Sequence, residues 1–364
     1  MSAIAALPYV REIAPYVAGK PIDELARELR LDTASIVKLA SNENPRGMPE
    51  SAKRAIAAAV TDLGRYPDSN GFALKSALST KLNVPADWIT LGNGSNDILE
   101  LAAAALLAPG RSCVYAQHSF AVYALATQAR GARAIVVPAK NLGHDVDEMA
   151  SAIEADTALI YLANPNNPTG THVDAATFAG FLARVPPHVV VVIDEAYNEY
   201  LPPDRRFDSV KWVRKYPNLL ISRTFSKAYG LAGLRVGYGV AQPELTDLLN
   251  RVRHPFNVNS VELAAALAAL NDAAFLAESY ELNRLGMQSL NKAFRALGMD
   301  YVPSFGNFVL VKVGHGAGVY QELLKRGVIV RPVGNYGLPE WLRVTVGLPE
   351  ENARFLDALR AALA

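Results

Sequence analysis

The sequence contains few of the features that direct a chain to a membrane, to a secretory route or to nucleic acid. Only one of its 364 residues is a cysteine, so no disulfide can form within the chain, and this scarcity favours a reducing compartment. Lysine plus arginine (36) almost equals aspartate plus glutamate (35), and a net charge of +1 predicts no basic surface for nucleic acid. The N-terminal residues lack a basic segment followed by a long apolar one, so we expect no signal peptide. The longest uncharged apolar run, 101–109, is too short to cross a bilayer, and we expect a cytoplasmic protein.

The length and the composition predict two folded domains. The chain is 51% hydrophobic and 20% charged, as soluble globular proteins are. From residue 112 onward, short apolar strands alternate with helices, which predicts an α/β fold with a mainly parallel sheet covered by helices on both faces. Beyond about residue 250 the pattern becomes that of a smaller α+β domain. We expect an N-terminal arm that packs with the small domain, a large domain and a small C-terminal domain: 1–30, 31–250 and 251–364.

The expected elements follow from hydrophobic pattern and from glycine and proline positions. The strands expected in the large domain are 87–91, 112–117, 132–139, 158–165, 188–197 and 218–225. The helices expected there are 49–63, 72–82, 98–107, 120–130, 146–156 and 174–185. A first helix is expected over 21–29, and the small domain is expected to contain helices 260–270, 275–297, 318–326 and 350–362 around three strands.

Four polar motifs follow predicted strands of the large domain. They are GNGSND (92–97), NPNNPTG (164–170), DEAYNEY (194–200) and SRTFSK (222–227). Ligands of parallel α/β sheets bind at the carboxyl ends of the strands. Four strand ends of this kind predict one shared site, which is a stronger indication than any single motif.

The first motif has the chemistry of an anion site. A strand, a glycine turn and a helix N-terminus present free backbone N–H groups and the positive end of a helix dipole. Position 97 is aspartate where a dinucleotide fingerprint needs its third glycine, so that fingerprint is weak. A single phosphate held by the N–H groups of Ser95 and Asn96 fits better, and the alternative is a plain capped helix.

The stretch from Ile221 to Gly239 contains the most reactive candidate. Lys227 lies where the strand breaks, among glycines that indicate a close approach of the backbone to another group. Thr224 and Ser226 supply hydroxyls beside it. Arg235 lies between apolar residues and needs an anionic partner, for which a phosphate is suited.

Asp194 ends the apolar run VVVVID and also needs a cationic partner. One interpretation is a structural salt bridge with Lys227. The other is that Asp194 faces a ligand cation while Lys227 bonds covalently to the ligand. Pyridoxal phosphate would use all of these groups at once. Its ring nitrogen pairs with an anion, its phosphate binds a helix N-terminus and an arginine, and its aldehyde bonds to a lysine.

The motifs NPNNPTG, DEAY and RTFSKAYGLAGLRVGY, with RYPD (65–68) and LASNENP (39–45), carry a family resemblance. The chain resembles the fold-type I pyridoxal-phosphate aminotransferases and, among them, the histidinol-phosphate aminotransferases, from residue 14 to residue 347. The resemblance implies a fold-type I fold, a homodimer with a shared active site, and transamination between histidinol phosphate and 2-oxoglutarate that yields glutamate. It implies no metal, no nucleic acid and no membrane.

The resemblance also implies roles for individual residues. The implied catalytic residues are Lys227, Asp194 and Tyr197. The implied cofactor contacts are Ser95, Asn96, Phe120, Asn167, Asp194, Tyr197, Thr224, Ser226, Lys227, Arg235 and, from the other subunit, Tyr66. The implied substrate contacts are Tyr16, Asn42, Arg331 and Arg343.

One departure and three alternatives stay open at this stage. The family often has proline two residues before the stacking aromatic, whereas this chain has His118, which we interpret as a packing residue rather than a pocket residue. The alternatives are an aromatic amino acid aminotransferase, a decarboxylase of a phosphorylated amino acid, and a non-catalytic regulatory domain. The last usually carries a DNA-reading module, for which the charge balance gives no support.

Overall fold

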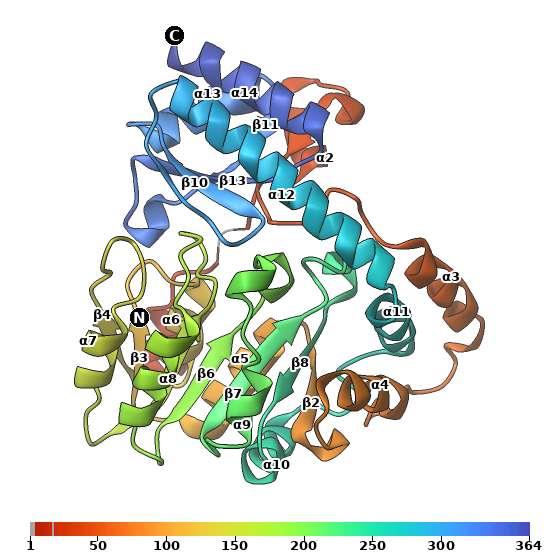
Figure 1. Ribbon diagram of the computed structural model, residues 1–364, viewed down its shortest axis with the longest axis vertical. Coiled ribbons are helices and arrows are strands. Elements are labelled where there is room, and N and C mark those ends of the chain that lie inside the picture. Colours follow the sequence, from red (N-terminus) through yellow and green to blue (C-terminus); the bar gives the residue numbers. More distant parts are fainter. Residues whose placement is uncertain (1–3, 17) are drawn as a thin grey trace.

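The computed structural model describes residues 4–16 and 18–364. Figure 1 shows a larger domain built around a sheet and a smaller domain above it, with the long helix α12 (Ala273–Ala296) running between them. No single helix in the described ranges is long and apolar enough to cross a membrane; only α11 (Ser260–Leu270) and α12 taken together reach the length and composition, and they meet at 76°.

The large domain is organised on a seven-stranded sheet with the strand order β2-β8-β7-β6-β5-β3-β4. Its strands are β2 (Ile89–Asn93), β3 (Ser112–Ala116), β4 (Arg133–Val137), β5 (Thr157–Ala163), β6 (Val190–Asp194), β7 (Leu219–Thr224) and β8 (Val236–Val240). Neighbouring strands run parallel from β7 to β4, and β8 alone is antiparallel to both of its neighbours. The prediction of a mainly parallel α/β sheet is confirmed.

Strand β8 is the strand of the large sheet that the sequence analysis did not predict. Its glycines weaken the strand signal, because glycine has no side chain to pack and marks close backbone approaches instead. A Cβ at Gly237 would lie 2.4 Å from the backbone nitrogen of Ser95, so only glycine lets β8 pass the start of α5 (Ser95–Leu106). The expected close approach is therefore real, and it is made by a strand.

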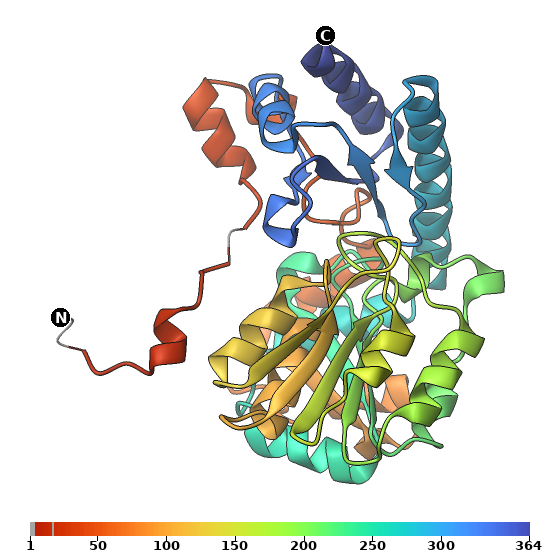
Figure 2. The same ribbon diagram turned by 90° about the vertical axis from the view of Figure 1, so that its left-hand side faces the viewer.

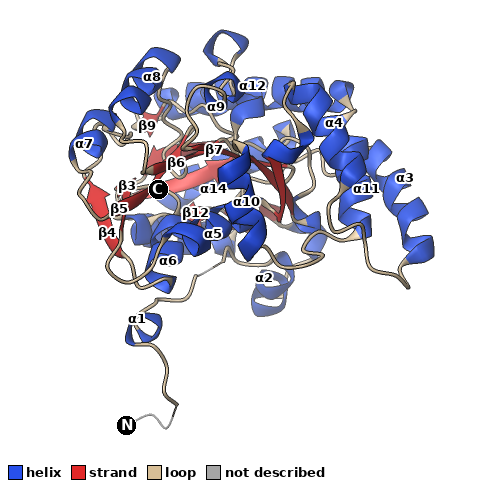
Figure 3. Ribbon diagram, turned by 90° about the horizontal axis from the view of Figure 1, so that it is seen from below, coloured by secondary structure: helices blue, strands red, loops and turns tan. Residues whose placement is uncertain are grey.

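Helices cover both faces of the sheet, as Figure 3 shows from below. Neighbouring residues of β5 are both fully buried on opposite faces: Ile160 packs in one core cluster and Tyr161 in the other. The Ile160 face is covered by α3 (Glu50–Ala59), α4 (Phe72–Leu82), α7 (Val146–Ser151), α8 (Ala175–Arg184), α9 (Val210–Val213) and α11. The Tyr161 face is covered by α5, α6 (Ala121–Ala129) and α10 (Pro243–Val252).

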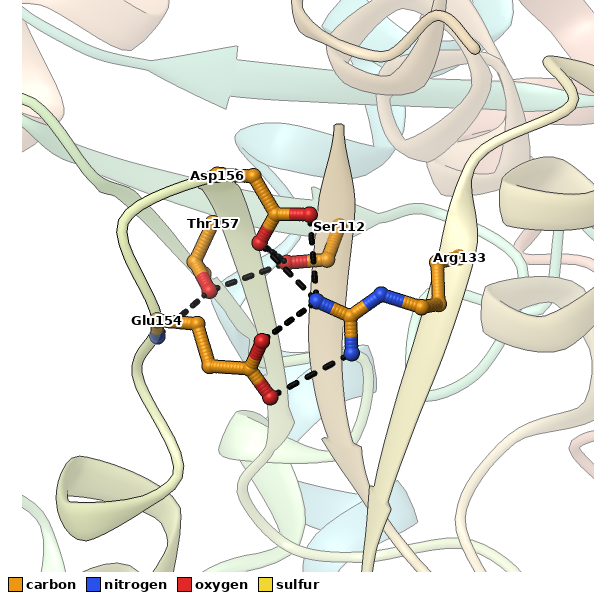
Figure 4. A network of polar contacts seen from close by, with 5 residues as sticks. All are labelled: Ser112, Arg133, Glu154, Asp156 and Thr157. Carbon is orange, nitrogen blue, oxygen red and sulfur yellow. Dashed lines mark hydrogen bonds and ion pairs between the residues drawn. The ribbon is translucent and has the colours of Figure 1, made fainter. Parts of the chain in front are cut away.

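Helix α7 ends at Ser151, five residues before the predicted end at 156. The segment after it is used in a polar network at the amino ends of three strands, drawn in Figure 4. Arg133 contacts Glu154 at 2.6 Å and Asp156 at 3.0 Å, and Asp156 accepts a hydrogen bond from Ser112 Oγ at 2.9 Å. This network ties β3, β4 and β5 together at the edge of the sheet opposite to the polar motifs.

The small domain has an antiparallel sheet with the order β12-β13-β10-β9. Its elements are β9 (Tyr301–Val302), β10 (Phe308–Lys312), α13 (Gly316–Lys325), β11 (Val328–Ile329), β12 (Arg331–Pro332), β13 (Trp341–Thr345) and α14 (Pro349–Leu363). Strand β1 (Val37–Lys38) pairs with β11, and α2 (Ile22–Leu29) packs beside it.

The predicted domain boundaries stay a prediction. Two elements pack with the domain on the other side of the predicted boundary. Strand β1 follows the boundary at residue 31 but pairs with β11 of the small domain. Helix α11 follows the boundary at residue 251 but packs on α3 and α4 in the large domain's core. Figure 2 shows the N-terminal arm with α1 (Pro8–Arg11) extending away from the small domain, and none of the α1 residues is buried.

Candidate active site

All predicted site residues except Tyr66 line one cavity of about 200 Å³ at the carboxyl edge of the large sheet. They come from α5, from the ends of β6 and β7 and the segments after β3, β5, β6 and β7, from the small-domain strands β12 and β13, and, for Tyr16 and Asn42, from the segments before α2 and after β1. The cavity is lined by Tyr16, Gly19, Ala40, Ser41, Asn42, Ser95, Asn96, Phe120, Ala163, Pro165, Asn167, Asp194, Ala196, Tyr197, Thr224, Ser226, Lys227, Arg235, Arg331, Tyr336 and Arg343.

The register of the central strands brings the motifs together. Asp194 lies opposite Ala163 of β5 and opposite Ser222 of β7, so three motifs begin at the same level of the sheet. Residues alternate between the two faces of a strand. Asp194 therefore shares its face with Val192, on the side that α5 and α6 cover.

The Asp194 carboxylate is held by two donors. Its side chain is buried, with the residue 5% exposed, and Tyr123 Oη donates a hydrogen bond to Oδ2 at 2.9 Å. The Ala196 N–H donates to Oδ1 at 3.3 Å. Burial raises the pKa of Asp194 to about 6, against the opposite effect of these two hydrogen bonds. The carboxylate thus lines the cavity as an anion at neutral pH with room for a cationic partner.

Lys227 does not pair with Asp194. Its Nζ donates to the backbone carbonyl of Ser41 at 3.0 Å, and within residues 4–16 and 18–364 no ion pair joins the two side chains. Burial, and next the Arg343 guanidinium, lower the pKa of Lys227 to about 8. The structural salt bridge is thus not formed, and the amine is one that can lose its proton near neutral pH.

The start of α5 and Arg235 form an anion cradle. Gly94 has φ +80°, and a Cβ there would lie 2.7 Å from Arg235 Nη2, so the guanidinium approaches the turn before Ser95 closely. Arg235 Nη1 donates to the carbonyl of Ala232 at 3.1 Å and contacts Ser226 Oγ at 3.4 Å. No carboxylate of the described chain forms an ion pair with Arg235. A helix N-terminus with a converging arginine fits a phosphate.

Two further arginines lie at the other side of the cavity. Arg331 and Arg343 are directly opposite each other on β12 and β13, and both are buried. Arg343 donates to the carbonyl of Ala40 at 2.6 Å and to Asn167 Oδ1, while its buried Nε has no hydrogen-bond partner among the described residues. Like charges opposite each other in a sheet are destabilising. An anion between them would relieve this repulsion, so the pair is suited to an anionic substrate.

Neighbouring aromatic and amide groups complete the walls. The Arg331 guanidinium lies over the Tyr16 ring, 5.6 Å from its centroid. Asn42 was predicted as a substrate contact, but its amide is already used inside the protein: Nδ2 donates to Tyr197 Oη at 2.9 Å, and Oδ1 accepts from Thr345 Oγ1 at 3.0 Å. Asn42 thereby orients Tyr197 at the cavity wall.

Two tyrosines outside the predicted set contact the site. Tyr123 binds Asp194, and Tyr336 lines the cavity from the small domain. Neither had a motif to mark it, since the chain has 15 tyrosines and both contacts join segments distant in sequence. His118 donates through Nδ1 to the carbonyl of Tyr336 and lines an adjoining cavity, to which Tyr16 and Arg331 also contribute, so its interpretation as a packing residue stays a prediction.

Tyr66 is the predicted residue that the structure leaves away from the cavity. It is 82% exposed, and its ring stacks on Phe256 with centroids 4.6 Å apart. Asn257, next to Phe256, donates to the carbonyl of Leu91 in β2 at 3.1 Å. The exposed aromatic pair therefore lies beside the strand that leads into the anion cradle.

The groups of the cavity fit pyridoxal phosphate one by one. The cradle matches its phosphate, Asp194 its ring nitrogen, and the Lys227 amine its aldehyde. The family model "Aminotransferase class I and II" matches residues 34–359. The chain belongs to this aminotransferase family. The family membership agrees with a buried amine and carboxylate in one cavity, and it favours an enzyme over the non-catalytic regulatory domain.

Among the proteins that this chain is similar to, two relatives and one solved structure are named as histidinol-phosphate aminotransferases. Histidinol-phosphate aminotransferase 1 of Cupriavidus pinatubonensis is 70% identical over 359 residues, which cover 98% of this chain and 96% of the relative. Histidinol-phosphate aminotransferase 2 of Ralstonia nicotianae is 67% identical over 360 residues, with coverages of 98% and 96%. The crystal structure of histidinol-phosphate aminotransferase from Sinorhizobium meliloti in complex with pyridoxal-5'-phosphate matches with a TM-score of 0.91 at 27% identity, covering 100% of this chain and 98% of that one.

Proposed function

We propose that this aminotransferase uses pyridoxal phosphate to interconvert histidinol phosphate and 2-oxoglutarate with imidazole-acetol phosphate and glutamate, a step of histidine biosynthesis. The observation that carries the proposal is the buried pair Arg331 and Arg343 in the same cavity as Lys227 and Asp194. A phosphate monoester carries up to two charges and three acceptor oxygens, so two arginines suit it. The names of the similar relatives support the same substrate. We place the enzyme in the cytoplasm, as its cysteine content favours.

The cofactor would be held by groups already oriented for it. Ser95, Asn96, Ser226 and Arg235 would bind its phosphate, with Thr224 beside them. Asp194 would pair with the ring nitrogen, and Phe120 would stack on the ring. When bound, pyridoxal phosphate supplies an electron sink for the charge left on a substrate carbon after proton removal.

Tyr197 and Asn167 would contact the ring hydroxyl. Tyr197 Oη already accepts a hydrogen bond from Asn42 and keeps its own proton to donate. Asn167 Oδ1 accepts from Arg343, which leaves the Nδ2 group of Asn167 as its donor toward a ligand. Both residues are buried and line the cavity.

Lys227 would carry the proton. Its Nζ would take the proton from the substrate Cα and return it at C4′ of the cofactor, which requires an amine that is neutral near physiological pH. Burial and Arg343 lower the pKa of Lys227 to about 8, and a general base works best when its pKa lies near the working pH. Ser41, whose carbonyl accepts from Nζ at 3.0 Å, keeps the amine inside the cavity.

The proposal is tested by steady-state rates on histidinol phosphate, phenylalanine and tyrosine, each with 2-oxoglutarate. We expect the highest kcat/KM for histidinol phosphate. A higher value for phenylalanine or tyrosine would instead identify an aromatic amino acid aminotransferase. Carbon dioxide release without an amino acceptor would identify a decarboxylase.

Substrate choice should depend on Arg331. Replacing Arg331 with methionine is expected to lower kcat/KM for histidinol phosphate by on the order of tenfold to a hundredfold, because a charge-assisted hydrogen bond contributes about 1.5–3 kcal/mol. Phenylalanine gives Arg331 no anion to bind, so its kcat/KM should change little. Replacing Arg343 should lower kcat/KM for both substrates and for glutamate.

The matched control for this prediction is Arg206→Met. Arg206 also lies over a tyrosine ring, that of Tyr280 at 5.2 Å, but it lines a different cavity. It should leave the ratio of the two substrates unchanged. An unchanged ratio in the Arg331 variant as well would contradict the phosphate-site assignment.

We also propose a homodimer in which Tyr66 reaches the cofactor phosphate of the partner. An exposed aromatic pair, Tyr66 and Phe256, beside the anion cradle supports this role, since large exposed aromatics mark association sites. Mixing inactive Tyr66→Ala and Lys227→Ala subunits is expected to restore activity, because one of the two sites in each heterodimer is then intact.

The mixing experiment needs proof that subunits exchange, for example by native mass spectrometry of differently tagged chains. Each parent incubated alone under the same conditions provides the control. No recovery after demonstrated exchange would argue against a shared site.

A further inference from the structure

Tyr123 carries two contacts that no catalytic motif accounts for. It lies in the first turn of α6 and is fully buried. Its Oη donates to Asp194 Oδ2 at 2.9 Å, across 71 positions of sequence. Its ring also meets Phe120 edge to face, with centroids 5.9 Å apart and planes at 90°. One side chain therefore touches both the carboxylate and the aromatic residue that line the cavity.

The Tyr123 ring cannot turn its hydroxyl elsewhere. It is stacked on Tyr161 of β5, with centroids 4.7 Å apart and planes at 6°. Tyr161 is itself fixed, because its Oη donates to the carbonyl of Leu99 in α5 at 2.7 Å. A buried ring held on two sides keeps its rotamer, so the Tyr123 hydroxyl is a preorganised donor.

The Asp194 carboxylate depends on this donor more than an exposed carboxylate would. Its other hydrogen bond comes from the Ala196 N–H at the longer distance of 3.3 Å. No lysine, arginine or histidine of the described chain forms an ion pair with it. A buried charge with one weak donor is costly, so the strong donor decides both the orientation and the ionisation of the carboxylate.

We propose that Tyr123 is a positioning residue that orients the Asp194 carboxylate toward the ring nitrogen and the Phe120 ring toward one face of the cofactor ring. This inference rests on the proposed function, since it assumes that pyridoxal phosphate occupies the cavity. Tyr123 does not line the cavity itself and acts only through Asp194 and Phe120. Its hydroxyl keeps Asp194 anionic and aimed at the ring nitrogen.

The test compares two matched variants, Tyr123→Phe and Tyr161→Phe. Each removes one buried phenolic hydroxyl from the same stacked pair, and only the first removes a hydrogen bond to Asp194. The first readout is the affinity of the apoprotein for pyridoxal phosphate, measured by equilibrium dialysis. We expect about tenfold weaker binding for Tyr123→Phe, because hydrogen bonds to charged groups are the strong ones, and little change for Tyr161→Phe.

The second readout is the pH dependence of that affinity. The titratable groups that interact with Asp194 are Tyr123 from α6, Tyr161 from β5, the nearby Glu195 and Tyr197, and Lys227 from the segment after β7. Burial raises the pKa of Asp194 to about 6, and the Tyr123 hydrogen bond opposes the rise. Without it the pKa rises further, so affinity should begin to fall at a higher pH in Tyr123→Phe. The pH midpoints of wild type and Tyr161→Phe should coincide.

A double-mutant cycle separates positioning from simple loss of packing. In an Asp194→Asn background the same Tyr123→Phe change should cost less affinity, because a hydrogen bond to a neutral amide is weaker than one to a carboxylate. Thermal unfolding of the apoproteins checks that the variants fold. Should Tyr123→Phe give no folded protein, 4-fluorophenylalanine at position 123 fills the hydroxyl's space without donating a hydrogen bond.

Failure of the role of Tyr123 and failure of the proposed function would give different results. Equal affinity and equal pH midpoints for the two phenylalanine variants would overturn the role of Tyr123. An equal loss with and without the Asp194 carboxylate would do the same. A wild-type protein that binds no pyridoxal phosphate would instead overturn the proposed function, independently of Tyr123.

Discussion

Replacing Lys227 with alanine is expected to lower transamination by about 10⁴-fold or more, the upper range for removing a group that acts by acid–base chemistry. The amine is buried and held by the Ser41 carbonyl, and its pKa is lowered to about 8 by burial and then by Arg343. Within the described chain, no other lysine lines this cavity. The measurement is the rate on histidinol phosphate with 2-oxoglutarate, together with cofactor content after dialysis.

The matched control for Lys227 is Lys81→Ala. Lys81 also donates to a backbone carbonyl, that of Leu270 at 3.0 Å, and burial likewise lowers its pKa, but it lines another cavity. This control should keep wild-type turnover. The Lys227 variant should stay folded and retain pyridoxal phosphate by non-covalent contacts. Turnover near the wild-type rate in that variant would rule out its assigned role.

Replacing Asp194 with asparagine is expected to slow turnover on the order of 10²- to 10³-fold. A preorganised charge that acts on the reacting system contributes about 3–4 kcal/mol. The amide keeps the shape of the carboxylate and can still accept from Tyr123, so the loss would come from charge rather than from packing. Rates of proton removal from substrate Cα, followed with deuterated substrate, measure the effect on the step in which Lys227 acts.

The control for Asp194 is Glu199→Gln. Glu199 belongs to the same segment after β6, and burial also raises its pKa. It lines a different cavity, to which none of the proposed cofactor-binding residues contributes. It should leave the rate unchanged. A loss smaller than tenfold in Asp194→Asn would indicate a structural role for the carboxylate.

Local sequence was sufficient for the layers of the large domain and for the strand-end motifs of the candidate site, whereas the family resemblance was needed for Phe120, Arg331 and Arg343. Strands such as β5 and β6 can be predicted from their continuous apolar runs, because every residue of each strand is buried on one face or the other. The motifs after these strands were predicted to meet because parallel strands end at one edge, and the register of Asp194 with Ala163 and Ser222 realises that. Strand β8 escaped prediction because its glycines, which serve contact with α5, remove the strand signal.

Only the tertiary structure decided which groups contact each other. The sequence left Lys227 either paired with Asp194 or free for a ligand, and the structure directs the amine to the Ser41 carbonyl instead. The structure also shows that the Asn42 amide forms hydrogen bonds with Tyr197 and Thr345. Contacts of this kind join segments more than a hundred residues apart, and no local pattern records them.

The amino-acid sequence by itself determined the chemistry of this protein: an amine, a carboxylate and an anion cradle in recognisable motifs, and two arginines that the family resemblance implied. The fold decided their environment. Burial moves the pKa of Asp194 up to about 6 and that of Lys227 down to about 8, and these shifts depend on which side chains exclude water. Tyr123 is the clearest case, because its role exists only where α6 packs against the face of β6 that carries Asp194.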